Sequence, residues 1–214
     1  MENKINFQFE ARYFTLGKAS EEIEQLWFVC HGHGQLAEYF IRKFKCLDNG
    51  KNLIVAPEGL SKYYLNGFTG RVGATWMTKE DRLRDIQNYI NYLGTVFTEV
   101  RAKLPAQLKV NLLGFSQGAA TISRFATQST IEFDQLILWA GIFPPDLPPL
   151  QSVERLKNKN VYWVYGNKDQ YLSDGVMLEQ TQIATQLKVT PEVISFEGEH
   201  ELNEKVLVDL SNIF

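Results

Sequence analysis

Ser116 has the surroundings that point most directly to chemistry. It is the central residue of Gly-Phe-Ser-Gln-Gly at 114–118, which matches the pattern G-x-S-x-G. In that pattern the serine occupies a sharp, strained turn between a buried strand and a helix, and small flanking residues let the two elements pass closely. Here the apolar run 109–113 precedes the turn and a helical pattern over 119–127 follows it. The sequence therefore predicts a nucleophilic serine; a plain strand–helix turn with an incidental serine is the alternative.

A serine hydroxyl needs partners before it can attack a carbonyl. A base must take its proton, and a carboxylate must hold that base in the right tautomer. When the serine lies on this kind of turn, Asp or Glu and then His follow it along the chain. Of the three histidines, His31, His33 and His200, only His200 follows Ser116. We therefore predict His200, in the loop after the expected strand 193–196, as the base; a surface histidine among carboxylates is the alternative.

The carboxylate has three candidates. Asp169 follows the expected strand 161–165 closely, and α/β sheets place functional residues at the carboxyl ends of their strands. Asp174 lies further along, where it can cap the next helix, and Asp146 lies among prolines after another strand. We predict Asp169 as the acid; its alternative role is that of a turn residue bonded to its own backbone.

The negative oxygen that forms on an attacked carbonyl needs fixed hydrogen-bond donors. One donor is expected from the backbone N–H of Gln117, the residue after the serine, and another from a loop after an earlier strand. The loop 31–34, His-Gly-His-Gly, follows the apolar run 26–30, and its glycines let backbone amides approach a substrate oxygen. The same loop offers a His-x-His metal site as an alternative, but the sequence shows no third ligand.

Composition narrows the class of protein. The chain has 214 residues, of which 44% are hydrophobic and 22% charged, enough apolar mass for one sizeable core. A formal net charge of −3 without a basic stripe argues against a nucleic-acid partner. Two cysteines, Cys30 and Cys46, do not make a disulfide framework. We see no signal peptide and no run of the about 20 apolar residues that span a bilayer, so we expect a cytoplasmic protein without stable membrane insertion. A homodimer is left open.

The expected elements alternate between strands and helices. Apolar or alternating runs predict strands at 6–14, 26–30, 52–56, 109–113, 136–140, 161–165 and 193–196. Helical spacing of apolar residues predicts helices at 36–47, 78–104, 119–127, 174–187 and 204–214. This order predicts an α/β fold with a mostly parallel central sheet and helices on both faces, in a single domain over 1–214 without a large lid domain.

The segment 57–78 differs from the rest of the chain. Its repeated glycines predict a long aromatic loop in which no regular element can run far. At its end, Thr78 with Asp81 three residues later resembles a helix cap.

Four segments together resemble a known family. The segments 30–34, 114–119, 165–169 and 198–200 are similar to those of the phospholipase/carboxylesterase family of α/β-hydrolases. That family includes acyl-protein thioesterases and small bacterial carboxylesterases, and the resemblance runs from about Leu26 to the C-terminus. It implies an α/β-hydrolase fold and a Ser-His-Asp triad that needs no metal and no cofactor.

The resemblance also implies a role for each residue. It implies Ser116 as the nucleophile, Asp169 as the acid and His200 as the base. The oxyanion amides would be those of His33 and Gln117, and His31 would be a structural histidine. The sequence departs from the family at His33, where a small apolar residue is common, and at 170–172, where the family usually has a Val-Pro pair.

These departures lie around the expected substrate pocket. Its walls are expected from apolar side chains in the neighbouring loops, namely Phe68, Trp76, Ile142, Phe143, Tyr171 and Leu172, together with Tyr63, Tyr64 and Leu65. Such walls favour a small-molecule carboxylic ester with a short to medium acyl chain. The alternatives are an acyl-protein thioesterase or lysophospholipase, and a non-catalytic binding protein on a hydrolase scaffold.

Overall fold

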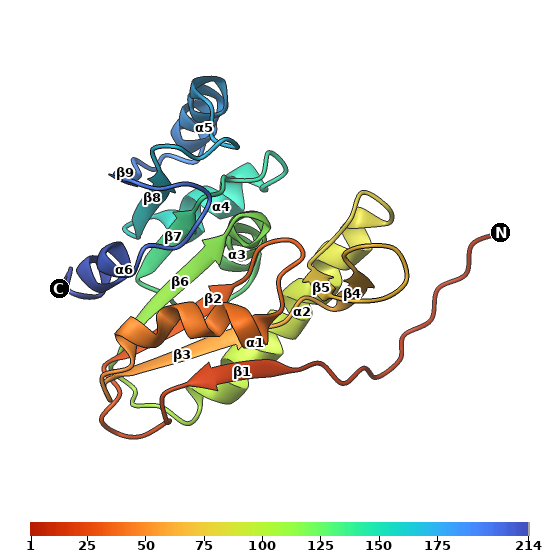
Figure 1. Cartoon of the computed structure of the whole chain (residues 1–214), viewed down its shortest axis with the longest axis horizontal. Helices are drawn as coiled ribbons and strands as arrows, with labels where there is room; N and C mark the ends of the chain where they lie inside the picture. The colour runs from red at the N-terminus through yellow and green to blue at the C-terminus, as the bar shows by residue number, and fades with distance from the viewer. Residues whose placement is uncertain (214) are drawn as a thin grey trace.

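A seven-stranded sheet forms the centre of the structure, a computed structural model that describes residues 1–213 apart from the side chain of Asp174. Its strands are β1 Tyr13–Leu16, β2 Gln25–Cys30, β3 Asn52–Pro57, β6 Lys109–Phe115, β7 Gln135–Trp139, β8 Asn160–Gly166 and β9 Glu192–Phe196. They lie in the order β1-β3-β2-β6-β7-β8-β9 (Figure 1). All neighbouring pairs are parallel except β1 with β3.

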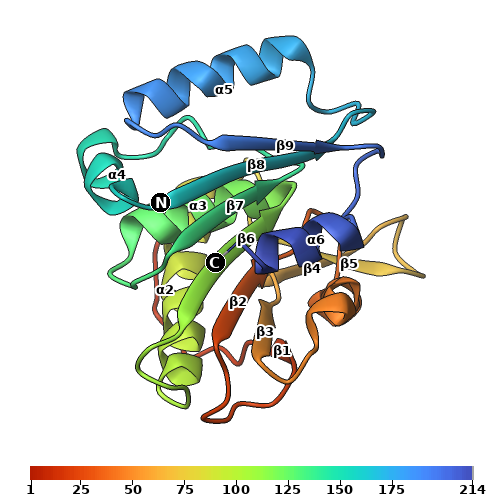
Figure 2. The same ribbon diagram turned by 90° about the vertical axis from the view of Figure 1, so that its left-hand side faces the viewer.

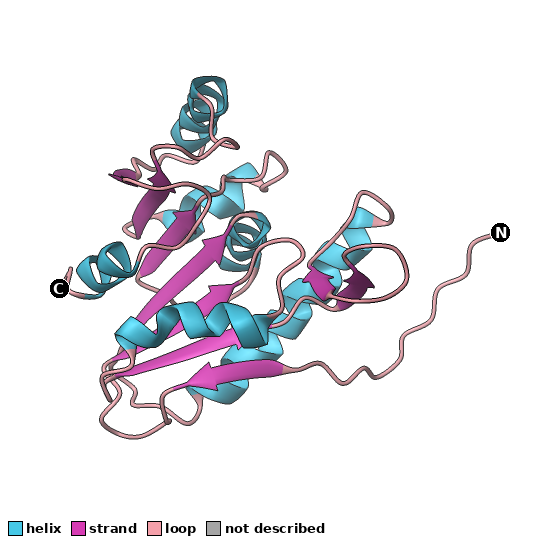
Figure 3. Ribbon diagram, viewed as in Figure 1, coloured by secondary structure: helices cyan, strands magenta, loops and turns pink. Residues whose placement is uncertain are grey.

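Helices cover both faces of this sheet (Figures 2 and 3). They are α1 Ala37–Phe40, the 3-10 helix η1 Ile41–Leu47, α2 Arg82–Arg101, α3 Gln117–Gln128, α4 Pro149–Leu156, α5 Asp174–Gln186 and α6 Glu204–Ser211. Helices α2 to α5 pack on one face, and α1, η1 and α6 pack on the other. The predicted α/β class, with a mostly parallel sheet between two helical layers, is confirmed.

Strand β2 shows why the central strands are continuous apolar runs. Successive side chains of a strand point to opposite faces of the sheet. Phe28 and Cys30 pack with α2 and α3, whereas Trp27 and Val29 pack with η1 and α6, and all four are fully buried. Because helices cover both faces, no position along the strand can be polar without a cost.

The segment 57–78 contains a short hairpin within the long loop that the sequence predicts. Strands β4 Ser61–Tyr64 and β5 Val72–Thr75 pair with each other, apart from the main sheet. The hairpin is bonded to the loop after β2, because Gly34 N donates to Ala74 O at 2.9 Å and Ala74 N donates to Gln35 O at 3.1 Å. The glycines therefore limit the length of these strands without preventing their pairing.

The first expected strand, 6–14, is wrong in its extent. Strand β1 begins at Tyr13, opposite Pro57, the last residue of its partner β3. Residues 1–12 have no strand beside them, and the N-terminal residues extend away from the sheet (Figure 1). An alternating pattern favours extended backbone, but a strand also needs a neighbour that continues alongside it.

Three helices also differ from expectation. Helix α2 begins at Arg82 rather than Thr78, because Asp81 has a left-handed backbone (φ 45°) and Thr78 Oγ1 accepts a hydrogen bond from Glu80 N instead. The expected helix 36–47 divides into α1 and η1. The sequence does not predict α4, which begins with Pro149 at a position where no N–H donor is needed. No helix within residues 1–213 is long and apolar enough to cross a membrane.

Candidate active site

Ser116 lies on a strained turn between β6 and α3. Its backbone has φ 54° and ψ −119°, and a strained conformation of this kind costs about 1–3 kcal/mol. A Cβ at Gly118 would lie 2.2 Å from Cys30 O, and a Cβ at Gly114 would lie 2.1 Å from Gly118 O. Neither glycine position has room for a side chain, which gives the G-x-S-x-G pattern a steric cause in this chain.

Asp169 and His200 meet beyond the carboxyl ends of β8 and β9. His200 Nδ1 lies 2.8 Å from Asp169 Oδ2, and Asp169 Oδ1 accepts a hydrogen bond from Tyr171 N at 2.9 Å. The Asp169 side chain is fully buried, and the His200 side chain is 23% exposed. Because an ionised carboxylate can only accept, the proton lies on Nδ1 of the neutral imidazole, and Nε2 is left as a base.

Two aromatic rings hold His200 beside the serine turn. The ring centroids of Phe115 and Tyr171 lie 5.0 Å and 4.7 Å from that of His200. Phe115 directly precedes Ser116, so His200 packs against the turn that carries the serine. Among the described residues no hydrogen bond joins the Ser116 hydroxyl to His200, a contact that in many enzymes tightens only in the substrate complex.

The two rival carboxylates are placed differently. Asp146 lies 2.7 Å from Arg124 Nη2 and 2.7 Å from Arg82 Nη2. Partial burial opposes its ionisation, but the two guanidinium groups outweigh burial, and the pKa of Asp146 lies below its usual value. Asp174 begins α5, and its side chain lies outside the described residues. Of the two candidates whose side chains are described, Asp169 bonds to His200 and Asp146 bonds to arginines instead.

The loop after β2 lies against the serine turn, as the sequence predicts. A Cβ at Gly32 would lie 3.2 Å from Ser116 Cβ. The amide of Gly32 donates to Gln35 Oε1 at 2.8 Å, and the amide of Gly34 donates to a carbonyl of β5 at 2.9 Å. Between them, the His33 amide has no acceptor in the part of the chain that is described. It is therefore free to donate to a substrate oxygen.

Gln117 supplies a second free amide and fixes it with its own side chain. As the first residue of α3, Gln117 has no intrahelical acceptor for its N–H. Its side-chain Oε1 accepts from Trp76 N at 3.2 Å, and its Nε2 donates to Met77 O at 3.0 Å. These bonds tie the start of α3 to the segment that follows β5.

His31 has a structural role. It is fully buried, its Nδ1 lies 2.8 Å from Gly32 O, and its Nε2 accepts from Gly59 N at 2.9 Å. Burial lowers the pKa of His31 to about 4, so the ring is neutral at neutral pH. A neutral ring with both nitrogens bonded holds the loop after β2 against the segment after β3.

His33 has partners that the sequence does not reveal. Its Nδ1 lies 3.2 Å from Thr75 Oγ1, its Nε2 lies 2.6 Å from Tyr63 Oη, and its ring packs on the Tyr63 ring. All four ring nitrogens of the His-x-His pair thus have protein partners. Within the described residues no group of three or more His, Cys, Asp or Glu side chains is arranged to hold a metal.

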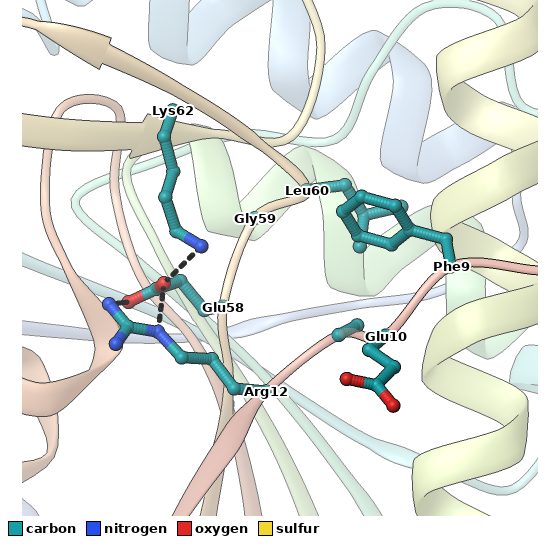
Figure 4. A pocket seen from close by; sticks show the side chains of 8 residues that line it. Phe9, Glu10, Arg12, Glu58, Gly59, Leu60 and Lys62 are labelled. Carbon is teal, nitrogen blue, oxygen red and sulfur yellow. Dashed lines mark hydrogen bonds and ion pairs between the residues drawn. The ribbon is translucent and has the colours of Figure 1, made fainter.

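Glu58, directly after β3, forms a second arrangement that sequence reasoning misses (Figure 4). Its buried carboxylate lies 2.7 Å from Arg12 Nε and 3.3 Å from Lys62 Nζ. Burial opposes ionisation, but these cations outweigh it and hold the pKa of Glu58 below its usual value. A cavity of about 220 Å³ lies beside them, lined also by Phe9 and Leu60 but by no triad candidate. The cluster fastens the N-terminal segment and β4 to the end of β3.

Two of the residues expected in the pocket wall lie in the core instead. Trp76 is 2% exposed and donates from Nε1 to His31 O at 2.8 Å. Phe143 is fully buried, and its ring packs against that of Trp163. Loop position and apolar character do not distinguish a side chain that anchors a loop from one that faces a ligand, and here the first role holds.

The other expected wall residues lie nearer the surface. Phe68 is 91% exposed in the loop that joins β4 to β5, and Ile142 and Leu172 are half-buried. Tyr171 is exposed and packs against His200. A hollow of about 160 Å³ adjoins His200, and its other lining residues are Lys168, Gln170 and Glu199.

Comparison with known proteins defines the class of structure. No family model matches the chain. Its structure is similar to that of a carboxylesterase from Mesorhizobium loti (TM-score 0.70, 14% identity, 94% of this chain and 92% of that chain). It is also similar to acyl-protein thioesterase 2 from Zea mays (0.65, 17%, 94% and 98%) and to a phospholipase/carboxylesterase from Dyadobacter fermentans (0.65, 18%, 97% and 98%). The chain therefore has the α/β-hydrolase fold of these structures.

Proposed function

We propose that the protein is a serine hydrolase that cleaves small carboxylic esters with short to medium acyl chains. The observation that carries this proposal is the hydrogen bond between His200 and Asp169, formed beside the turn that carries Ser116. A buried carboxylate behind a histidine, next to a serine on a strained turn, is the arrangement that activates a hydroxyl group. The fold shared with solved esterases supports the same reaction class.

The mechanism follows from these positions. His200 Nε2 takes the proton of the Ser116 hydroxyl while its oxygen attacks the ester carbonyl, and Asp169 stabilises the imidazolium that forms. The amides of His33 and Gln117 donate to the oxyanion. His200 then gives its proton to the leaving alcohol, and the acyl group remains on Ser116. Water activated by His200 hydrolyses this acyl-enzyme and restores the serine.

The hollow beside His200 borders the proposed base, and Ser116 is not among its lining residues. The adjoining hollow is about 160 Å³, and its lining includes charged side chains. Trp76 and Phe143 belong to the core and do not enlarge this hollow.

We place the protein in the cytoplasm, because its two cysteines, Cys30 and Cys46, are both free thiols.

Thioester hydrolysis is the second candidate function. One similar solved structure is named an acyl-protein thioesterase, and the same triad can cleave both bond types. Rates on p-nitrophenyl butyrate and on a matched butyryl thioester, followed by octanoyl and palmitoyl pairs, separate the two. A strong preference for long-chain thioesters would replace our first assignment with the second.

The test of catalysis itself uses Ser116→Ala with Ser129→Ala as its matched control. Ser129 lies at the C-terminal end of α3, where its hydroxyl donates to Phe125 O. We expect Ser116→Ala to lose at least about 10⁴-fold in kcat on p-nitrophenyl butyrate and to lose labelling by a fluorophosphonate. Ser129→Ala should keep both. A Ser116→Ala protein with the parent rate would show that Ser116 is not the nucleophile, and a parent protein that neither hydrolyses the ester nor is labelled would show that the chain is a non-catalytic binding protein.

A further inference from the structure

The Thr75 hydroxyl lies where the two proposed oxyanion donors meet through their side chains. Thr75, the last residue of β5, is 2% exposed. Its Oγ1 lies 3.2 Å from His33 Nδ1 and 3.0 Å from Gln117 Oε1. His33 and Gln117 are the same two residues whose backbone amides are free to bind an oxyanion. One hydroxyl group therefore contacts both loops that carry the donors.

The chemistry of the partners fixes the direction of these hydrogen bonds. Gln117 Oε1 and Met77 O, 3.0 Å and 2.9 Å from Thr75 Oγ1, are pure acceptors, so the single hydroxyl proton points to one of them. His33 Nδ1 must then donate to Thr75 Oγ1. In the neutral ring His33 Nε2 is left as an acceptor, and the Tyr63 hydroxyl donates to it at 2.6 Å. Hydrogen bonds therefore run from Tyr63 through His33 to Thr75, and the Thr75 hydroxyl then donates either to Gln117 Oε1 or to Met77 O, which itself accepts from Gln117 Nε2 at 3.0 Å.

We propose that Thr75 is a positioning residue that sets the separation of the two oxyanion amides. The inference rests on the proposed function. The His33 loop and the start of α3 are far apart in the sequence, and a site of this kind must hold its donors within about 0.5 Å of the productive geometry. Gly34 N donates a hydrogen bond to Ala74 O of the hairpin, and Trp76 N, directly after the hairpin, donates one to Gln117 Oε1. The Thr75 side chain joins these two attachments directly.

The test replaces the hydroxyl with a methyl group of similar shape. Removing an entire oxyanion donor lowers kcat by about 10²–10³, so displacing donors in Thr75→Val should lower kcat about 10- to 100-fold. KM should stay within about twofold, because the oxyanion forms only after the substrate binds. Thr75→Ser keeps the hydroxyl and should restore kcat to within about threefold of the parent.

A matched control is available in Thr127→Val. Thr127 is also fully buried and also donates its hydroxyl, to Ser123 O at 2.8 Å. It lies ten residues along α3 from Gln117, which is about 15 Å at 1.5 Å per residue. The same change of chemistry at Thr127 should leave kcat unchanged. An equal loss of kcat in Thr127→Val would mean that any buried hydroxyl has this effect, and it would overturn the proposal.

Inhibitor binding provides a readout that a purely structural role would not move. A trifluoromethyl ketone forms a tetrahedral adduct with an oxyanion, whereas the product carboxylic acid does not. In Thr75→Val the affinity for the ketone should fall by the same factor as kcat, and the affinity for the acid should change less than twofold. An unchanged kcat, a parallel rise in KM, or no recovery in Thr75→Ser each overturns the inference.

Two further results keep the outcomes distinct. If Thr75→Val does not fold, Tyr63→Phe tests the proposal, because it removes only the hydrogen bond from Tyr63 to His33. A fall in kcat of about threefold or more at constant KM supports the positioning role of these hydrogen bonds. An unchanged kcat overturns it. If the parent protein hydrolyses esters while the Thr75 and Tyr63 variants match it, the inference alone fails. If the parent protein shows no hydrolysis, the proposed function fails and the inference with it.

Discussion

Replacing Asp169 with Asn exchanges one oxygen of the proposed triad for an NH₂ group and leaves the packing intact. In the parent, Oδ1 accepts from Tyr171 N at 2.9 Å and Oδ2 accepts from His200 Nδ1 at 2.8 Å. The Tyr171 amide is a donor, so the oxygen of the new carboxamide turns toward it. The NH₂ group of the carboxamide then faces His200 Nδ1. A donor in that place forces the imidazole proton onto Nε2, which is the atom that must accept the proton of Ser116.

The size of the effect follows from this wrong tautomer. In a serine protease the equivalent change lowers kcat about 10⁴-fold while the geometry is preserved. That factor corresponds to about 5 kcal/mol of lost transition-state stabilisation. We therefore expect Asp169→Asn to fold normally and to reduce kcat on p-nitrophenyl butyrate by about 10⁴, with a much smaller change in KM.

The assay compares Asp169→Asn with Asp146→Asn and Asp174→Asn under the same conditions. Asp146 pairs with Arg124 and Arg82, so its variant should lose stability but keep kcat within about threefold. Circular dichroism confirms that each variant is folded. The reasoning is refuted if Asp169→Asn keeps more than a tenth of the parent kcat, or if either of the other variants loses as much activity.

Two predictions concern stability. Gly118→Ala places a Cβ 2.2 Å from Cys30 O and should lower the free energy of unfolding, measured in urea, by about 3 kcal/mol. Gly94 lies inside α2, where the nearest atom to a new Cβ is Phe125 Cε2 at 4.0 Å, so Gly94→Ala should raise that free energy by about 0.5–1 kcal/mol. Equal effects would contradict the steric argument. Glu58 has a folded-state pKa below its ordinary value of 4.5, so its ion pairs stabilise the protein above that pH and this contribution is lost as the pH falls through the folded-state pKa. Unfolding free energies from pH 7 to pH 3 should fall less steeply in Glu58→Gln than in the parent, and identical slopes would rule this out.

The sequence predicts the parts of the site that depend on local pattern and chain order. The glycines around Ser116 are needed because there is no room for a side chain at Gly114 or Gly118, and this requirement is visible within five consecutive residues. The positions of Asp169 and His200 follow from strand ends, because parallel strands bring their carboxyl ends to one edge of a sheet. The structure joins these two residues by a hydrogen bond. Seven expected strands likewise correspond to the central sheet, although the first is much shorter than its pattern.

The remaining features depend on contacts between distant segments. Tyr63 and Thr75 reach His33 only because a hairpin forms within 57–78 and then bonds to another loop. No local sequence pattern predicts that this hairpin bonds to the loop that carries His33. Glu58 gains its role from Arg12, which lies 46 residues earlier. The aromatic residue Trp76 could not be assigned to core or pocket before the packing around it was known.

At Ser116 the strained backbone lowers the stability of the protein, whereas the proposed catalysis needs a serine in that conformation. Glycine is the residue that adopts a positive φ without a steric cost, so the substitution that relieves this strain also removes the proposed nucleophile. Under the proposed mechanism, selection for hydrolysis therefore holds the chain above its lowest free energy at this position. A lineage released from that selection has an immediate route to a more stable and inert scaffold, and binding proteins on this fold are then an expected evolutionary product.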